Sequence, residues 1–289
     1  MQFNYYNFSG DIKKKQTFVF ISDLHCRNSE QVLEKIEEGA KNKIISQSQN
    51  KNLNQNKNNN NNSNKRNNNN NNNNNNINNI SANNNPTAID NIDAVLIAGD
   101  VLHNSELYNE GLRFLNSVSK KYPTFCSLGN HETRIQNQDI INKIYNQNAV
   151  ILNNDYVLFN GIILGGLTSG EHCSRFRMFS KTPAPDLNFI NKFSNLSGYK
   201  ILLSHHPEYY GKYLKDKNIN LILSGHAHGG QWRLFNRGFF ATGQGFFPKY
   251  TSGMYGNMIV NRGLSHENIF PRINNPTEII YITVSPFNK

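Results

Sequence analysis

The sequence predicts an α/β fold in four layers, an αββα sandwich of two mixed β-sheets flanked by helices. Short runs of β-branched and aromatic residues alternate with segments whose apolar residues recur at helical spacing, which is the rhythm of βαβ units. An Asn160-Gly161 pair is typical of a type I′ hairpin turn, and it marks the point where a second sheet begins. Further apolar runs near the C-terminus complete that sheet.

In the first half, each predicted strand ends at a polar motif. Residues 17–22 (TFVFIS) form the first strand, and apolar residues from Val32 to Ile44 then recur at helical spacing. Asn28 or Ser29 can cap this helix through a side-chain oxygen. The other expected elements are strands at 93–98, 123–128 and 150–152, and helices at 105–121 and 135–145.

The second half is expected to contain mostly strands. The predicted elements are a hairpin at 156–164, strands at 200–204 and 220–224 that each end at a histidine, a short helix at 207–214, and terminal strands at 256–262 and 277–284. Residues 168–186 are polar and lack periodicity, so we expect a long loop that faces the site.

An Asn-rich tract at 47–85 interrupts the first half and cannot supply a core. Setting aside its 39 residues leaves 250 of 289, a suitable length for one domain over 1–289 with a disordered insertion. The tract also contains four basic residues and no acid, so the rest of the chain carries +6 of the total net charge of +10. That charge is scattered, which permits nucleic-acid binding without indicating it.

The remaining composition favours a soluble, cytoplasmic protein. The three cysteines, Cys26, Cys126 and Cys173, show no paired spacing, and buried reduced thiols are the simplest interpretation. No secretory leader precedes residue 17, and no apolar run approaches the roughly 20 residues that would span a bilayer. Oligomeric state cannot be inferred from these features.

Five short motifs follow the predicted strands in order. They are Asp23-Leu24-His25, Gly99-Asp100, Gly129-Asn130-His131-Glu132, His205, and Gly225-His226-Ala227-His228. Each supplies hard oxygen or imidazole donors at a strand end, where side chains from distant segments meet in one crevice. Taken alone, the first two motifs are better explained as turn or capping residues, and the motifs that follow shift this balance toward a metal site. The two imidazoles of the last motif, flanked by glycines, favour metal ligation most strongly.

The ordered pattern DxH, GD, GNH(D/E), H, GHxH resembles the calcineurin-like metallophosphoesterase superfamily, over essentially the whole chain outside the Asn-rich tract. The segments 247–250, 261–264, 271–272 and 278–280 further look like a bacterial-type, little-characterised subgroup. The resemblance implies the calcineurin-like phosphoesterase fold and two divalent or trivalent metal ions, with Mn, Fe and Zn the leading candidates.

Transferred residue by residue, the resemblance implies a division of the ligands. Asp23, His25 and His228 would hold one metal ion, Asn130, His205 and His226 the other, and Asp100 would bridge them. A bridging hydroxide would then attack phosphorus in line. His131 would be the catalytic residue that assists departure of the leaving group, and Glu132 would orient it.

Other residues near the motifs are weaker candidates. His206 adjoins a ligand and is expected to face away, while His103 occupies a position where purple acid phosphatases place a tyrosine, which argues against a tyrosinate-iron site. His103 could still touch substrate or a ligand. Candidates for phosphate contact on position alone are Arg175, Arg177, Lys181, Gln231 and Arg262, and the last could instead brace the terminal strands.

The motifs therefore predict a metal-dependent phosphomonoesterase or phosphodiesterase acting on a small phosphorylated substrate or a phospholipid headgroup. A nuclease of the same superfamily is an alternative, although a single Trp and scattered charge give it limited support. A non-catalytic metal-binding scaffold is a further alternative, but such a protein should have lost ligands that are all present here.

Overall fold

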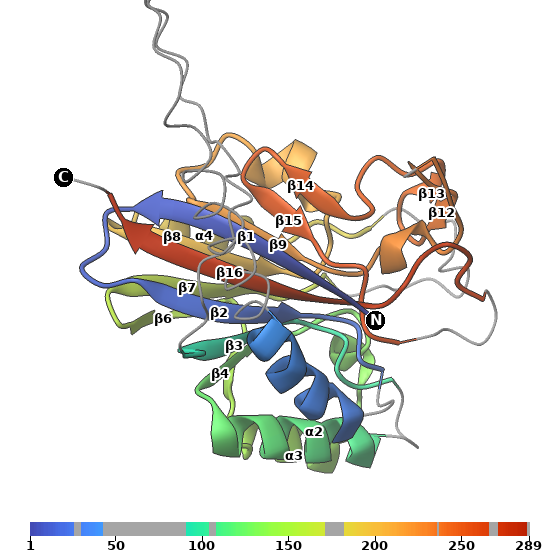
Figure 1. Ribbon diagram of the computed structural model, residues 1–289, viewed down its shortest axis with the longest axis horizontal. Helices are drawn as coiled ribbons and strands as arrows, with labels where there is room; N and C mark the ends of the chain where they lie inside the picture. The colour runs from blue at the N-terminus through green and yellow to red at the C-terminus, as the bar shows by residue number, and fades with distance from the viewer. Residues whose placement is uncertain are drawn as a thin grey trace, which may run out of the picture.

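Two six-stranded β-sheets pack face to face at the centre of the molecule, and helices cover their outer faces (Figure 1). The computed structural model describes residues 1–25, 30–42, 91–103, 108–170, 182–235, 237–265 and 271–287. The predicted αββα class with two mixed sheets is confirmed. The predicted disorder of residues 47–85 falls outside the described residues, as do the candidate helix caps Asn28 and Ser29.

The first sheet has the strand order β1-β16-β2-β3-β4-β5. Its strands are β1 (Gln2–Gly10), β2 (Gln16–Ile21), β3 (Ala94–Ala98), β4 (Thr124–Ser127), β5 (Val150–Leu152) and β16 (Glu278–Pro286). β2, β3, β4 and β5 run parallel, whereas β16 pairs antiparallel with β2. The carboxyl ends of β2, β3 and β4 therefore lie at one edge of the sheet.

The second sheet has the order β14-β15-β9-β8-β7-β6. Its strands are β6 (Asp155–Phe159), β7 (Ile162–Leu167), β8 (Tyr199–Ser204), β9 (Leu221–Ser224), β14 (Gly253–Tyr255) and β15 (Met258–Val260). β7, β8, β9 and β15 are parallel, and β6 joins β7 through the Asn160-Gly161 turn. Both turn residues have positive φ, as the predicted type I′ geometry requires.

Three apolar clusters fill the three interfaces between the four layers. On β2, Val19 and Ile21 face the first cluster together with helix α2 (Tyr108–Lys121), while Phe18 and Phe20 face the second cluster, between the sheets. The third cluster joins the second sheet to helix α4 (Leu187–Ser194). This alternation explains why the central strands are almost wholly apolar, since both of their faces are buried.

The remaining elements are one further helix and several short helices and strands. They are the helical residues 30–42, α3 (Gln138–Tyr145), η1 (Glu132–Arg134), η2 (Tyr210–Leu214), η3 (His228–Gly230), and two small hairpins formed by β10 (Arg233–Leu234) with β11 (Arg237–Gly238) and β12 (Phe240–Ala241) with β13 (Gly245–Phe246). α3 begins later than predicted because the Asn137 side chain caps it.

The elements that were not predicted from the sequence include β1, α4 and the short strands β10 to β14. β1 pairs parallel with β16 and is only half-buried along most of its length, so its residues lack the continuous apolar run of a central strand. α4 begins after Asp186, whose side chain accepts a hydrogen bond from the backbone of Phe189. Its apolar residues cover the outer face of the second sheet.

Candidate metal centre

The five polar motifs all follow the carboxyl ends of central strands. The sequence places Asp23 and His25 after β2, Asp100 after β3, and Asn130 and His131 after β4. His205 follows β8, while His226 and His228 follow β9. The structure brings these residues together from both sheets, as the contacts below show.

One group of donors consists of Asp23, His25 and His228, whose ligand atoms all lie within 4.8 Å of one another. The Nε2 atoms of His25 and His228 are 3.3 Å apart, and His228 Nε2 is 3.5 Å from Asp23 Oδ1. All three residues are buried. This is the set that the sequence assigned to one metal ion.

A second group consists of Asp100, His205 and His226. His205 Nε2 lies 3.0 Å from Asp100 Oδ2 and 3.2 Å from His226 Nδ1. Asp100 Oδ2 is also 4.0 Å from His25 Nε2, so this carboxylate lies between the two groups. Asn130 follows β4, and its Oδ1 atom is buried without a hydrogen-bond partner among the described residues.

The backbone of the site is strained at most of the proposed ligands. Asp23, His25, Asp100, His226 and His228 all have positive φ, between 45° and 64°. This region is sparsely populated by residues other than glycine, and holding a side chain there costs about 1 kcal/mol or more. Strain of this kind persists where surrounding contacts enforce it, and it clusters at functional sites.

Two motif glycines allow the ligand loops to approach closely. A Cβ at Gly129 would overlap the Asp100 carboxylate and backbone, and a Cβ at Gly225 would overlap the Asp23 carboxylate and Ser22. The loops after β3 and β4, and those after β2 and β9, can therefore meet only because these positions carry no side chain.

Electrostatics divides the imidazoles into two kinds. Burial, together with nearby imidazoles, holds the pKa of His25 and of His226 well below the usual value, so both rings are neutral. Burial also opposes protonation of His205, but the carboxylates of Asp100 and Asp23 raise its pKa to about 10. Conversely, burial would raise the pKa of Asp100, and His205 brings it well below its usual range.

The donor chemistry fits metal ions. Neutral imidazole is the form that coordinates a metal, so an ion bound at His205 would replace the Nε2 proton that Asp100 and Asp23 stabilise. His205 Nδ1 donates to the Ala98 carbonyl at 2.7 Å, which directs Nε2 toward Asp100. His226 Nε2 and Asn130 Oδ1 are buried polar atoms that have no hydrogen-bond partner within the described part of the chain. Two carboxylates, an amide oxygen and four imidazoles are a mixed set suited to first-row transition metals.

His131 differs from the proposed ligands in exposure and orientation. Its side chain is 22% exposed, whereas the buried Asp100 carboxylate is 2% exposed. His131 Nδ1 donates to the His103 carbonyl at 2.6 Å, and Nε2 lies 3.9 Å from Asp100 Oδ2. The His131 ring therefore lies between solvent and the donor cluster, with Nε2 near the Asp100 carboxylate.

His103 is closer to the site than a surface residue would be. Its Nδ1 lies 3.1 Å from His25 Nδ1, and its ring stacks on that of His131 with centroids 5.1 Å apart. His25, His103 and His131 form a further cluster of candidate ligand atoms. The structure therefore supports the interpretation in which His103 touches a ligand.

Glu132 does not orient His131 through its carboxylate, and that part of the prediction is wrong. Its oxygens accept hydrogen bonds from the backbone N–H groups of Asp100, Leu102 and Gly129, at 2.8 to 2.9 Å. Burial and the nearby Asp100 carboxylate raise the pKa of Glu132. Glu132 instead fastens the loop after β3 to the loop after β4, and the His103 carbonyl orients His131.

His206 lies beside the second donor group, outside the predicted set. It is fully buried, its ring centroid is 4.1 Å from that of His226, and its Nδ1 is 3.3 Å from Glu208 Oε1. Burial would raise the pKa of Glu208, but His206 lowers it. His206, Glu208 and His226 form another cluster of candidate ligand atoms.

Of the five weaker candidates for phosphate contact, the structure describes Gln231 and Arg262. Arg262 donates through Nη1 to Gln2, and its backbone N–H donates to Glu278, so it braces β1 and β16 as the alternative predicted. Gln231 is buried directly after η3. Arg175, Arg177 and Lys181 lie outside the described residues.

Of the three cysteines, Cys26 and Cys173 also lie outside the described residues. Cys126 is buried, as expected, and burial raises the pKa of its thiol well above the usual value.

Two residues that the sequence did not single out as site residues contact His228. Arg272 Nη2 lies 3.4 Å from His228 Nδ1, and Asn275 Nδ2 donates to the His228 carbonyl at 2.7 Å. Both come from the segment before β16, about 45 residues further along the chain. Arg272 belongs to a segment that contributed to the subgroup resemblance, but no local spacing connects either residue to the motif, so these contacts could not be predicted from the sequence.

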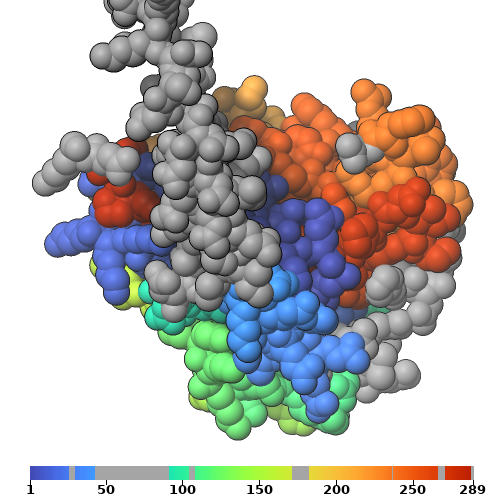
Figure 2. Space-filling model, viewed as in Figure 1, coloured from blue at the N-terminus to red at the C-terminus, as the bar shows by residue number. Residues whose placement is uncertain are grey.

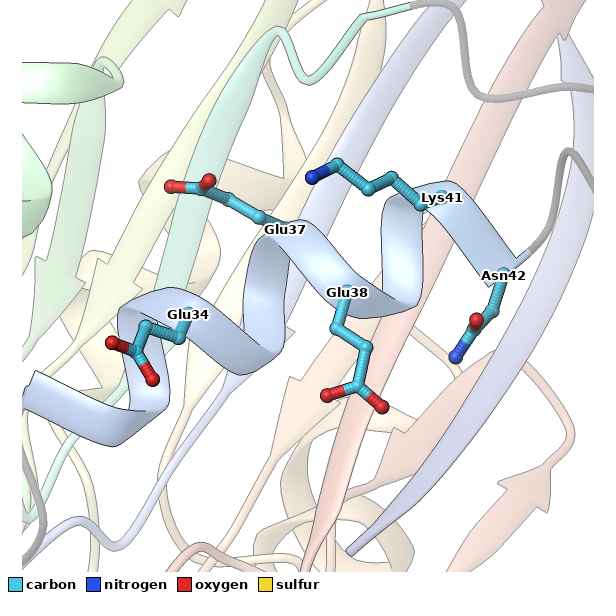
Figure 3. Close-up of a pocket in the computed structure, with 5 residues that line it drawn as sticks. All are labelled: Glu34, Glu37, Glu38, Lys41 and Asn42. Atoms are coloured by element: carbon cyan, nitrogen blue, oxygen red, sulfur yellow. The ribbon is translucent and has the colours of Figure 1, made fainter.

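A shallow hollow elsewhere shares no residue with the centre. It is lined by Glu34, Glu37, Glu38, Lys41 and Asn42, all from the helical residues 30–42, and Figure 3 shows their side chains spreading from that one helix. Lys121 pairs with Glu37 there. This feature is a charged helix surface and contains none of the residues of the five motifs.

The fold and its donor groups define an α/β protein with candidate metal-ligand sets at the strand ends. The model of the calcineurin-like phosphoesterase family matches residues 16–230, which include all five motifs. The chain belongs to this family.

Curated relatives carry the same family description. A Helicobacter pylori protein named as an uncharacterized metallophosphoesterase is 31% identical over 204 residues, which cover 68% of this chain and 52% of that protein. A Bacillus subtilis protein with a similar name is 27% identical over 68% of this chain and 69% of its own length. The chain thus spans about half the length of the Helicobacter relative.

A solved Staphylococcus aureus structure, titled as a putative 5'-nucleotidase, aligns with 92% of this chain and 54% of its own chain at 13% identity, with a TM-score of 0.43. A likeness at that level supports no conclusion about function. Among the described residues, no helix is long and apolar enough to cross a membrane.

Proposed function

We propose that this protein hydrolyses phosphoesters at a dinuclear metal centre. In this proposal Asp23, His25 and His228 hold one ion, and Asn130, His205 and His226 hold the other, with Asp100 between them. Family membership supports metal-dependent phosphoester hydrolysis in general, and the ligand division is supported by the two separate donor groups.

The single observation that carries the proposal is the position of Asp100. Its Oδ2 atom lies 3.0 Å from His205 of one group and 4.0 Å from His25 of the other. A carboxylate has two oxygens and can bridge two cations, which a neutral ligand does less readily. Asp100 Oδ1 also accepts a hydrogen bond from the His131 backbone at 2.9 Å, which fixes its orientation.

The protein's own residues would orient the substrate and supply a proton. Two bound cations would supply a nucleophilic water at neutral pH and neutralise charge on the phosphate. His131 Nδ1 already donates to the His103 carbonyl, so Nε2 is the nitrogen that can give a proton to the departing oxygen. The exposed side of His131 provides the access that a leaving group needs.

The proposal includes the metals and the class of substrate. Manganese, iron and zinc remain the leading metals for this donor set. The proposed substrate is a small phosphorylated molecule or a phospholipid headgroup, cleaved as a phosphomonoester or a phosphodiester. Which of these substrates is accepted depends on segments such as 168–186, whose residues are not part of the five motifs. The cytoplasmic location expected from the sequence stays a prediction.

A direct test combines metal analysis with hydrolysis. Full-length protein would be loaded separately with Mn²⁺, Fe²⁺ and Zn²⁺, and assayed on p-nitrophenyl phosphate, bis-p-nitrophenyl phosphate and single-stranded DNA. We expect hydrolysis of at least one chromogenic ester that requires the metal. Absence of both bound metal and hydrolysis would overturn the proposal and favour a scaffold, whereas preference for DNA would favour the nuclease alternative.

A further inference from the structure

An exposed group of aromatic and aliphatic side chains directly follows the last ligand motif. Phe235 is 90% exposed, Phe247 76% and Leu234 67%, and Phe246 is also exposed. They lie on or next to the two small hairpins β10–β11 and β12–β13. Figure 1 shows β12 and β13 at one end of the molecule, away from α2 and α3. Large apolar side chains gathered in this way usually mark an interaction surface.

Four of the aromatic side chains in this region contact one another. Phe239 is at their centre, with its ring stacked on Trp232 at 5.5 Å between centroids. The rings of Phe246 and Phe247 approach Phe239 at 5.4 and 5.5 Å, both edge to face. We call these residues, together with Leu234 and Phe235, the aromatic surface. Figure 2 shows the orange segment that contains them at the edge of the visible face.

The aromatic surface lies in a part of the chain that carries only positive charge. No Asp or Glu occurs between Asp216 and Glu267 in the sequence. Arg237 and Lys249 are both exposed, and they lie two residues after Phe235 and Phe247. Exposed aromatic rings next to cationic side chains match the interface of an anionic bilayer, where rings enter the headgroup layer and cations meet lipid phosphates.

The geometry of the surface also fits a bilayer better than a flat protein face. Leu234 and Phe235 lie at the turn between β10 and β11, and Phe246 and Phe247 lie at the end of β13. Leu234 and Phe235 at the β10–β11 turn, together with the adjoining rings, can enter a fluid headgroup layer without a complementary groove on a partner.

Buried hydrogen bonds connect this surface to the metal centre. Arg233 Nη1 donates to the Gly229 carbonyl at 2.6 Å, and the Phe239 backbone N–H donates to the Gly230 carbonyl at 3.0 Å. Gly229 and Gly230 follow the proposed ligand His228 directly. A surface held this way would dock with a fixed orientation relative to the centre.

We propose that the aromatic surface docks the protein on an anionic phospholipid bilayer. Docking at this place would favour a phosphoester carried by a membrane lipid as the substrate, and that second statement rests on the proposed function. The docking itself is independent of catalysis, because it depends on residues that are outside the proposed ligand set.

The experiment measures flotation of the full chain with vesicles of phosphatidylcholine, either pure or mixed with phosphatidylglycerol. We expect binding to the mixed vesicles, weakening with salt, and about tenfold less binding by the double variant Phe235→Ser/Phe247→Ser. The matched control is Leu158→Ser, because Leu158 on β6 is 69% exposed and lies outside the aromatic surface. This control should bind as the unchanged protein does.

Three outcomes would overturn the docking proposal: no vesicle binding, equal binding by the double variant and the unchanged chain, or a dimer in solution that the double variant dissociates while vesicles stay unbound. Hydrolysis of p-nitrophenyl phosphate, measured on the same samples, separates the two proposals. Vesicle binding without hydrolysis would support docking and count against the proposed function, whereas hydrolysis without vesicle binding would do the reverse.

Discussion

The two sheets contribute different chemistry to the candidate metal centre. The loops after β2, β3 and β4 of the first sheet carry all its oxygen donors, namely Asp23, Asp100 and Asn130. The loops after β8 and β9 of the second sheet contribute only the imidazoles of His205, His226 and His228.

Because the proposed ligands come from both sheets, neither sheet can form the candidate metal centre alone. One donor group combines Asp23 and His25 from the first sheet with His228 from the second. The other combines Asp100 from the first sheet with His205 and His226 from the second. The His226 backbone N–H donates to both oxygens of Asp23 at 3.1 Å, so the two sides are also joined by hydrogen bonds. Metal binding and packing of the sandwich should therefore be coupled.

Removing the oxygen donor shared by the two groups should have the largest effect. Asp100→Ala should reduce turnover by about 10³-fold, because both groups lose the carboxylate that lies between them. Metal content and hydrolysis of p-nitrophenyl phosphate would be measured together. Asp155→Ala is a suitable control, since Asp155 is exposed on β6 and should leave both values unchanged. Near-normal turnover in the Asp100 variant would refute its bridging position.

The next largest effect should come from a first-sheet residue that is not a proposed ligand. His131→Ala should lower kcat by about 10²-fold while metal content stays intact, as expected when a proton donor is lost. Single-turnover hydrolysis and elemental analysis would check this. Loss of metal in this variant would instead make His131 a ligand, and unchanged kcat would remove it from the reaction.

Removing the metal should loosen the contact between the sheets. An ion at about 100 times its Kd stabilises the folded state by about 3 kcal/mol per site, so chelation should lower Tm by several degrees. Thermal unfolding with and without chelator measures the shift, and readdition of metal should restore Tm. An unchanged Tm, despite measured metal binding, would contradict coupling between the sheets.

A smaller effect is expected within the first sheet alone. Glu132→Gln replaces one acceptor oxygen by an amide NH₂ beside three backbone donors, and it should cost about 2 kcal/mol of unfolding free energy. Denaturant unfolding of the metal-free protein isolates this cost from metal binding. A variant as stable as the parent would show that Glu132 does not fasten the two loops.

The sequence predicted the strand ends well because the central strands are buried on both faces. Phe18 to Ile21 and Ile201 to Leu203 read as apolar runs, and a polar motif after each run marks where the strand stops. β1 escaped prediction because it is half-buried and its polar residues break the pattern. α4 escaped because its short apolar stretch follows a long polar segment.

Other features of the site could not be predicted from the identities of the residues in the motifs. The contacts of Glu132 and His131 are with backbone groups, and which backbone atoms are near depends on how the loops after β3 and β4 meet. The positive φ values of the proposed ligands likewise reflect the folded environment, since nothing about Asp or His requires that conformation. Arg272 reaches His228 only because the chain returns to the centre before β16.

The most direct test of the two-sided centre is the number of metal ions bound per chain. Full-length protein saturated with Mn²⁺ and freed of excess ion would be measured by elemental analysis, alongside Asp100→Ala. We expect two ions per chain in the parent protein and fewer in the variant. One ion or none in the parent, or two ions in both proteins, would contradict this expectation.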